Sequence, residues 1–366
     1  MAYKASCDRM LFTTVSLLTV FGLVMLYSAS SVLASTEHGM SSYYFVRQLI
    51  FAVIGFALML FLMNIDYRVW RNEKLVRLLV VASLLSLVLV LTQPPVNGAR
   101  RWLHLGSLST IQPSESAKLV VLIFLAAFLD KYAREINHLR QRLLPCLAVV
   151  AVFGVLIVVE PDLGQLVCIG MTTSILLFAA GLSLKYIGLA ICAIVPVFYI
   201  LVVRVPFRWE RVQTFLDPLR DPLGAGWQIS QSLTAVGSGG IAGVGLGASK
   251  QKLFFLPEAH SDFIYAVIGE ELGMIGTVLV VLAFALLFYR GVKIALKAPD
   301  GFGFYLALGI TVMVVVQALI NFSSVLAMMP AKGTALPFIS QGGTSLLLNL
   351  TASGILLNVS QFGERA

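Results

Sequence analysis

The sequence contains few charged residues. Asp, Glu, Lys and Arg make up 12% of its 366 residues, hydrophobic residues make up 58%, and the mean hydropathy is +0.91. A soluble domain usually has about 25% charged residues. The composition therefore excludes an ordinary soluble domain and predicts a polytopic membrane protein.

Cysteine is also scarce. Of four cysteines, Cys146, Cys168 and Cys192 lie in separate apolar runs, Cys7 lies in the amino-terminal tail, and no two have C-x-x-C spacing. The sequence therefore supports neither a disulfide framework nor a cysteine metal site. The formal net charge of +8 comes from short basic clusters between apolar runs. This distribution indicates membrane topology, and we expect no nucleic-acid partner.

Apolar runs long enough to cross about 30 Å of hydrocarbon occur at 10–34, 44–64, 75–92, 112–130, 143–160, 164–182, 184–204, 262–289, 302–328 and 341–361. The first run is longer than a signal-peptide core, so we expect it to be retained. The short loops on the side of the termini carry the excess of basic residues, for example Arg68, Arg71, Lys131 and Arg290. Both termini are therefore predicted to be cytoplasmic.

The predicted fold is an all-α polytopic membrane protein with about ten transmembrane helices. We expect one membrane domain over 1–366, with a large extracytoplasmic loop at 205–261 between helices 7 and 8. This loop is too long to be a simple connector. Its first half mixes aromatic and basic residues, including Trp209 and Arg211, which is typical of an interfacial helix. Its arginines could anchor the loop or hold an anionic lipid-linked substrate.

An acidic stretch follows the large loop. Glu258, His260 and Asp262 stand at its start, and Glu270 and Glu271 follow inside an apolar run. A carboxylate where a loop enters the membrane is costly, so Asp262 is a functional candidate. On a continuous helix, Glu270 would lie near the same face and share a cavity with Asp262, whereas Glu271 would need another partner.

Two further outward segments carry charged residues. Arg101 precedes a helix that we expect to begin at Pro113, and on that helix Glu115 and Lys118 are three residues apart and can pair. The pair could be structural or could face a cavity. Near the end, 329–345 combines two prolines and three glycines with Lys332. Irregular backbone at membrane depth is tolerated where it lines a cavity or is buried in protein. Lys332 could bind phosphate or could be a snorkelling anchor.

The glycine-rich segment 237–247 contains near matches to a dinucleotide-binding fingerprint. That fingerprint requires a strand before it and a helix after it in a βαβ unit, and an outward loop does not provide them. We therefore expect these glycines to allow close approach of backbone to a ligand or to another helix.

Four of these motifs together resemble the SEDS family (shape, elongation, division and sporulation), and the resemblance extends from Asp8 to about Gln361. The motifs run from Arg100 to Lys118, from Glu160 to Gly164, from Pro257 to Gly273 and from Pro330 to Ser345. Within the family, the sequence is most similar to division-type members, followed by elongation-type members. It differs from many division-type members at Phe254, where an acidic residue is common.

The resemblance implies a peptidoglycan glycosyltransferase that polymerises lipid II at the outer face of the bacterial cytoplasmic membrane. It also implies a class B penicillin-binding protein as partner, other division or elongation proteins, and undecaprenyl pyrophosphate as product. Asp262 matches the essential acid of the family. Substrate-binding or supporting positions are expected at Arg101, Glu115, Lys118, Glu258, His260, Lys332, Ser340, Gly342 and Gly343.

For the mechanism, we hypothesise that Asp262 is a general base on the acceptor hydroxyl in an inverting transfer. The alternative is that Asp262 helps to hold a divalent cation, Mg²⁺ or Mn²⁺. Lys332, Arg101 or a loop arginine would offset the pyrophosphate charge, and His260 is expected to be structural. We expect no organic cofactor. A lipid II flippase is the alternative function, and a non-catalytic scaffold for a partner synthase is a third.

Overall fold

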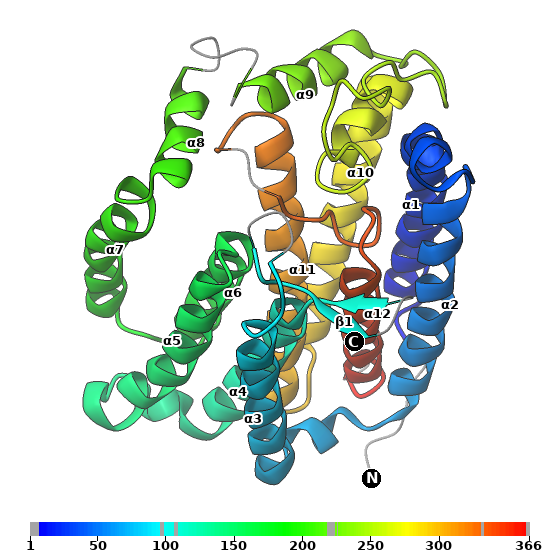
Figure 1. Ribbon diagram of the computed structural model, residues 1–366. Coiled ribbons are helices and arrows are strands. Elements are labelled where there is room, and N and C mark those ends of the chain that lie inside the picture. The colour runs from blue at the N-terminus through cyan, green and yellow to red at the C-terminus, as the bar shows by residue number, and fades with distance from the viewer. Residues whose placement is uncertain are drawn as a thin grey trace.

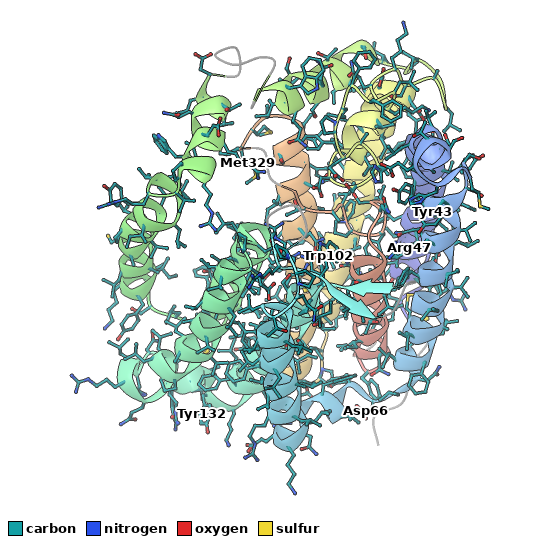
Figure 2. All side chains as sticks on the ribbon, in the orientation of Figure 1. Tyr43, Arg47, Asp66, Trp102, Tyr132 and Met329 are labelled. Atoms are coloured by element: carbon teal, nitrogen blue, oxygen red, sulfur yellow. The ribbon has the colours of Figure 1, made fainter. Side chains whose placement is uncertain are left out.

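The computed structural model is a bundle of long helices (Figure 1) and describes residues 7–95, 99–105, 109–217, 224, 226–330 and 333–363. Lys332, one of the predicted site residues, lies outside these ranges. Figure 2 shows that Tyr43 lies toward one end of the bundle, whereas Asp66 and Tyr132 lie at the opposite end. These are called below the upper and lower ends, as drawn.

The first half of the chain forms seven long helices. They are α1 (Arg9–His38), α2 (Tyr43–Asn64), α3 (Glu73–Val90), α4 (Pro113–Tyr132), α5 (Leu144–Val159), α6 (Leu163–Ala179) and α7 (Leu184–Phe198). Short helices η1 (Tyr67–Arg71) and η2 (Ala133–Glu135) connect some of them. The π-helical turns η3 (Leu139–Leu143) and η4 (Tyr199–Val203) extend α5 and α7. Pro113 occupies the first turn of α4, as predicted.

The second half forms α8 (Pro206–Leu216), α9 (Trp227–Ser238), α10 (Ile264–Leu296), α11 (Gly301–Val325) and α12 (Gly343–Ser360). Each of the ten predicted spans corresponds to one helix, with ends that differ by a few residues. Within the described ranges, seven helices are long and apolar enough to cross a membrane. The fold prediction of a polytopic helical membrane protein is confirmed.

α11 is the central helix of the bundle. It packs against α10, α4, α6 and α12, and most of its residues are buried. α12 packs along α2, where Gly354 faces the backbone of Met59 so closely that an added Cβ would lie 2.6 Å from its carbonyl oxygen. Because lipid tails give helices no hydrophobic reason to associate, small residues that allow such close packing stabilise the contact.

α7 stands apart from the main bundle (Figure 1). Among the side chains that the structure describes from Leu184 to Val203, none is buried, and Leu184, Leu189 and Val195 are all more than 60% exposed. Exposed apolar side chains on a membrane-spanning helix face lipid at no cost.

A small β-hairpin is the one sheet among the described residues of this helical fold. β1 (Leu103–Leu105) and β2 (Ser109–Ile111) pair antiparallel, with Leu103 opposite Ile111. The strands lie between α3 and α4, in the outward segment that carries Arg101. Runs of three residues are too short for alternation of polar and apolar residues to show in the sequence.

The large loop is partly helical, since it contains α8 and α9. The glycine-rich segment after α9 packs into a break in α10, where Gly273 has φ +65° and ψ −161°. The backbone N–H of Met274 donates to the Gly240 oxygen, and that of Val244 donates to the Glu270 oxygen. An added Cβ on Gly243 would lie 2.1 Å from the Glu271 oxygen. The expected close approach of this segment to a helix is confirmed.

Candidate active site

Asp262 lies in the turn that leads into α10, two residues before the helix begins. Its backbone oxygen accepts a 2.8 Å hydrogen bond from the Asn321 side chain, which also donates to the Thr334 oxygen at 2.7 Å. Asn321 on α11 therefore joins the Asp262 turn to the loop between α11 and α12, called below the last loop. On that loop, Gly333 lies against the carboxylate, and an added Cβ there would be 2.4 Å from Oδ2.

The charges around Asp262 alter its proton affinity. Burial raises the pKa of its carboxyl to about 7, and the negative charges of Glu258 and Asp162 act in the same direction. The positive charges of Arg101 and Arg211 act in the opposite direction. A carboxylate with a pKa near neutrality can accept a proton and release it again under physiological conditions.

Arg101 connects the hairpin segment to the turn between α5 and α6. Its Nε donates to the Glu160 backbone oxygen at 3.1 Å, and its terminal nitrogen donates to the Pro161 oxygen. Its neighbour Trp102 lies near the middle of the molecule in Figure 2. The side chain of Glu160 is fully buried, and within the described ranges its carboxylate has no hydrogen-bond partner. Burial raises the pKa of Glu160 to about 8, so this carboxyl is mostly neutral at pH 7.

Asp162 is held at the amino end of α6. Its side chain accepts hydrogen bonds from the Gln165 backbone at 3.3 Å, from Gln112 at 2.8 Å and from Ser114 at 3.2 Å. These bonds cap α6 and attach it to the start of α4. The motif from Glu160 to Gly164 therefore places Asp162 within electrostatic reach of Asp262.

The predicted Glu115–Lys118 pair is confirmed. The Lys118 Nζ lies 3.0 Å from Glu115 Oε2, and the two side chains are 3% and 5% exposed. Lys118 also donates to the Gln317 side chain at 2.6 Å, and Gln165 donates to Glu115. Gln317 in turn donates to the Ala335 oxygen at 2.8 Å. This network joins α4, α6, α11 and the last loop.

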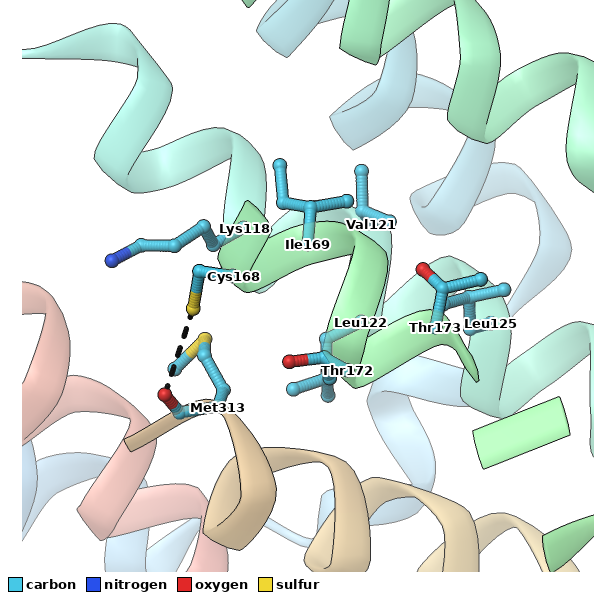
Figure 3. Close-up of a pocket in the computed structure, with 9 residues that line it drawn as sticks. All are labelled: Lys118, Val121, Leu122, Leu125, Cys168, Ile169, Thr172, Thr173 and Met313. Carbon is cyan, nitrogen blue, oxygen red and sulfur yellow. Dashed lines mark hydrogen bonds between the residues drawn. The ribbon is translucent and has the colours of Figure 1, made fainter. Parts of the chain in front are cut away.

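Lys118 borders a small enclosed cavity (Figure 3) of about 10 Å³. Cys168 and Met313 lie at the same cavity and share a 3.7 Å contact between the Cys168 sulfur and the Met313 oxygen. Such a volume holds about one water molecule. Because the two side chains are only 3% and 5% exposed, protein surrounds the pair, which favours the structural alternative over direct contact with a sugar.

Glu258 and His260 shape the turn before Asp262. Glu258 has φ +55°, and its carboxylate accepts a 2.6 Å hydrogen bond from Ser261. His260 packs against Tyr44 with ring centroids 5.1 Å apart, and its backbone oxygen accepts from the Gln341 N–H at 3.1 Å. Burial lowers the pKa of His260. A neutral imidazole against an aromatic ring agrees with the structural interpretation.

Ser340, Gly342 and Gly343 determine the shape of the last loop. The Ser340 hydroxyl accepts from the Leu336 N–H at 2.8 Å, and its backbone oxygen accepts from Gln48 at 3.1 Å. Gly342 donates to Gln48 at 3.2 Å. At Gly343, an added Cβ would lie 2.4 Å from the Phe51 ring. These residues therefore attach the loop to α2 and support the site from a distance.

Glu270 does not share a cavity with Asp262, which corrects the sequence-based expectation. The Glu270 carboxylate accepts from the Lys250 N–H at 2.9 Å and from the Ser249 hydroxyl. Glu271 has the separate partner that we expected, a 2.8 Å ion pair with Lys252. The expectation for Glu270 assumed a continuous helix from Asp262, whereas α10 begins at Ile264 and the glycine-rich loop covers its face.

Asp162 and Asn321 are site residues that were not expected from the sequence, and Arg211 was expected only as one of several loop arginines. The structure places all three in contact with Asp262 or within its electrostatic reach. Asp162 follows proline in a charged motif, and Asn321 is an amide inside an apolar span. A polar residue in or next to an apolar span suggests a functional role by itself. That both residues lie near Asp262 depends on tertiary packing, which the sequence does not show.

The residues near Asp262 fit a divalent cation only in part. Among the side chains that the structure describes, no three His, Cys, Asp or Glu residues could together hold a metal ion. Mg²⁺ often binds through one or two carboxylates together with substrate phosphate oxygens. Asp262 could supply such a carboxylate, and the substrate would supply the other oxygens.

The family described as cell cycle protein, which comprises FtsW, RodA and SpoVE, matches residues 8–365. This chain belongs to that family. The SEDS membership expected from the motifs is therefore confirmed.

Several relatives of this SEDS protein are similar over nearly their whole length. The probable peptidoglycan glycosyltransferase FtsW of Trichlorobacter lovleyi is 45% identical over 97% of this chain and 93% of the relative. Stage V sporulation protein E of Bacillus subtilis is 43% identical, with 99% of each chain covered. Both similarities exceed those of the solved structures described next.

Among solved structures, RodA of Thermus thermophilus has a TM-score of 0.71 and 26% identity, with 98% of each chain covered. A chain from a structure titled as a peptidoglycan synthase complex that coordinates polymerization and crosslinking has a TM-score of 0.78 and 28% identity, with 97% of each chain covered. The SEDS fold therefore extends over the entire helical bundle.

Proposed function

We propose that this protein polymerises lipid II, with Asp262 as the general base. Family membership and the similarity to proteins named FtsW make it a peptidoglycan glycosyltransferase in cell-wall synthesis. The observation that supports the role of Asp262 is its position, because a partly buried carboxyl with a pKa near 7 lies where Arg101 and Arg211 also act on it.

In the proposed reaction, Asp262 accepts the proton of the acceptor 4-hydroxyl. The oxygen then forms a bond to the anomeric carbon of the donor sugar, and the bond from that carbon to the pyrophosphate breaks with inversion. The leaving group carries the electron pair away as undecaprenyl pyrophosphate. Arg101 and Arg211 would stabilise its negative charge. Glu115 and Lys118 would act at a distance, by holding α4 and the last loop in place.

A bound Mg²⁺ or Mn²⁺ would supply further positive charge for the pyrophosphate. Asp262 is the side chain that we propose to hold it, together with substrate oxygens. This alternative assigns Asp262 a role as ligand rather than base, and the two roles differ in their response to pH and to added metal.

We propose that the upper end, with Asp262, faces outward from the cytoplasmic membrane. The lower end carries Arg68, Arg71 and Lys74, and basic residues concentrate on cytoplasmic loops. We also propose a class B penicillin-binding protein as partner, because the chain is similar to a component of a peptidoglycan synthase complex. Other division or elongation proteins would join this assembly.

A flippase would require polar groups that open onto a transport path. Four amides in the helices instead bind other parts of the protein: Gln165 donates to Glu115, Gln317 to Ala335, Asn321 to Asp262 and Asn349 to Ser345. These contacts favour the glycosyltransferase over the transporter.

The test is glycan formation from purified lipid II, with and without the cognate penicillin-binding protein and Mg²⁺ or Mn²⁺. Asp262→Asn should fold normally and reduce polymerisation by about 10²–10⁴-fold, the usual cost of removing a general base. Equal polymer from the wild type and this variant would refute the assignment of Asp262. A flipping assay in proteoliposomes would then test the transporter.

A further inference from the structure

A groove of about 600 Å³ lies at the upper end, between α1, α2 and the loop that precedes the Asp262 turn. Figure 1 shows α1 and α2 side by side at this end. Apolar side chains from all three segments line the groove, among them Val24, Tyr27, Phe45, Leu246 and Leu253. This volume is in the range of about 300–1,000 Å³ that is typical of small-molecule sites.

The groove is open to the lipid side of the protein. Val24 and Tyr27 are each 45% exposed, and Leu246 and Leu253 are 59% and 43% exposed. The proposed reaction uses none of these residues. An apolar groove on the surface of a membrane protein can bind the acyl chain of a lipid.

The polar residues at the inner side of the groove already bind one another. The Lys252 Nζ lies 2.8 Å from Glu271 Oε1, donates to the Gly247 oxygen at 2.7 Å and lies 3.2 Å from the Ser28 hydroxyl. Ser28 donates to both Glu271 oxygens. This buried ion pair is neutral overall, so it adds no net charge to the groove.

Lys250 differs from Lys252. It lines the groove and is exposed, and its backbone N–H is fixed by a 2.9 Å hydrogen bond to Glu270. Within the described ranges, no hydrogen bond or ion pair involves its ammonium group. The groove therefore combines an apolar lining with one exposed ammonium group, while the Glu270 carboxylate is held by the backbone N–H of Lys250 and the Ser249 hydroxyl.

The depth of the groove matches the boundary between acyl chains and headgroups. Ser31, a lining residue, is seven positions before the end of α1 at His38, which corresponds to about 10 Å along the helix axis. His38, Tyr43 and Tyr44 stack at the top of α1 and α2. Amphipathic aromatic rings concentrate at the membrane interface, so the groove begins just below the headgroup level.

We propose that this groove binds an anionic glycerophospholipid, with one acyl chain between α1 and the loop and the phosphate at Lys250. Basic residues next to apolar grooves at the interface recognise anionic lipids in this way. The lipid would hold the loop 246–253 against α1. This proposal concerns binding alone and does not depend on the proposed function.

The experiment is native mass spectrometry of the full chain in detergent, titrated separately with phosphatidylglycerol, phosphatidylethanolamine and undecaprenyl phosphate. Wild type should bind phosphatidylglycerol more tightly than phosphatidylethanolamine, and undecaprenyl phosphate shows how much binding at the Asp262 site contributes. Lys250→Ala should weaken phosphatidylglycerol binding about fivefold, the effect of about 1 kcal/mol per basic residue near an anionic lipid. Lys185→Ala, which removes another exposed lysine, should leave it unchanged.

A second pair of variants tests the groove itself. Ala248→Phe places a large side chain in the groove and should reduce binding of phosphatidylglycerol and phosphatidylethanolamine, whereas Ala242→Phe alters an exposed alanine of the same loop outside the lining. The proposal is wrong if Lys250→Ala behaves like Lys185→Ala, or if Ala248→Phe binds lipid as well as Ala242→Phe.

Discussion

Gly333 lies directly against the Asp262 carboxylate, with 2.4 Å between an added Cβ and Oδ2. Because the carboxylate is the free end of a side chain, it can turn away from a methyl group at little cost in stability. Gly333→Ala should therefore unfold at nearly the wild-type temperature but lose activity. A displacement of about 1 Å in a reacting group can cost about 10²-fold in rate.

The measurement is lipid II polymerisation beside thermal unfolding. Gly170→Ala is the matched control, because nothing lies within 4 Å of an added Cβ there. Normal polymerisation by Gly333→Ala would show that the observed position of the carboxylate is not needed for the reaction.

The pH dependence of the reaction should follow the protonation of Asp262. Burial raises the pKa of this carboxyl to about 7, and the base must be unprotonated to accept the hydroxyl proton. We therefore expect the polymerisation rate to rise about tenfold per pH unit below pH 7 and to level off above it. Rates measured from pH 5.5 to 8.5 at constant substrate saturation would test this. A rate that stays constant across this whole range would exclude the raised pKa.

The raised pKa of Asp262 also makes stability depend on pH, and stability should fall over the pH range in which the rate rises. The folded state holds the Asp262 proton more tightly than the unfolded state, whose carboxyl has a pKa near 3.8. The stabilisation is complete below pH 3.8 and is lost as pH rises through about 7. Asp262→Asn should therefore gain unfolding temperature relative to wild type as pH rises over this interval. An Asn variant that loses stability with rising pH, relative to wild type, would contradict the assignment.

Gly237 and Gly239, at the end of α9, allow the effect of close packing on stability to be measured apart from the effect of helix propensity. An added Cβ on Gly239 would lie 1.9 Å from the Gly269 backbone oxygen, whereas nothing lies within 4 Å of one on Gly237. Gly239→Ala should destabilise by about 1–3 kcal/mol or more, because backbone must move. Gly237→Ala should stabilise by up to about 1 kcal/mol. Unfolding temperatures of the two variants test this, and similar values would show that the loop does not pack on α10 as described.

Substitutions of Glu115 and Lys118 should be energetically coupled, because the two side chains form a buried ion pair. Lys118→Met leaves Glu115 unpaired in a site that is 5% exposed, so we expect a loss of about 3–5 kcal/mol. Glu115→Gln combined with Lys118→Met should recover much of this loss, because no unpaired charge remains. Thermal unfolding of the single and double variants measures the coupling.

Activity of the double variant then distinguishes the two roles of the pair. A structural pair predicts that polymerisation recovers together with stability. Recovery of stability without recovery of polymerisation would show that the charges act on the substrate.

The sequence predicted those features that depend on local pattern. Continuous apolar runs identified the ten helical ranges, and the spacing of Glu115 and Lys118 predicted their ion pair, because a helix brings positions three apart together. The close approach of the glycine-rich segment to a helix was also predicted, since only residues without a Cβ permit it.

Features that depend on distant parts of the chain were not predicted. Nothing near Glu270 in the sequence indicates that Ser249 and Lys250 bind its carboxylate. Asp162 lies 100 positions before Asp262, and only packing of the helices makes their charges interact. Whether a segment forms a helix follows from its own residues, whereas the partners of a buried charged side chain depend on how the helices pack together.

The break at Gly273 divides α10 into two mechanical parts. At this point the N–H groups of Met274 and Ile275 bond to Gly240 and Ile241 of the loop. The part that follows Asp262 is fastened to the same segment, because the N–H groups of Val244 and Gly245 donate to the Glu270 and Glu271 backbone oxygens. The two parts lie against each other, since the Tyr265 hydroxyl donates to the Thr277 backbone oxygen at 3.4 Å. A displacement of the large loop would therefore move both parts of α10 and would reach the Asp262 carboxylate through about two turns of helix.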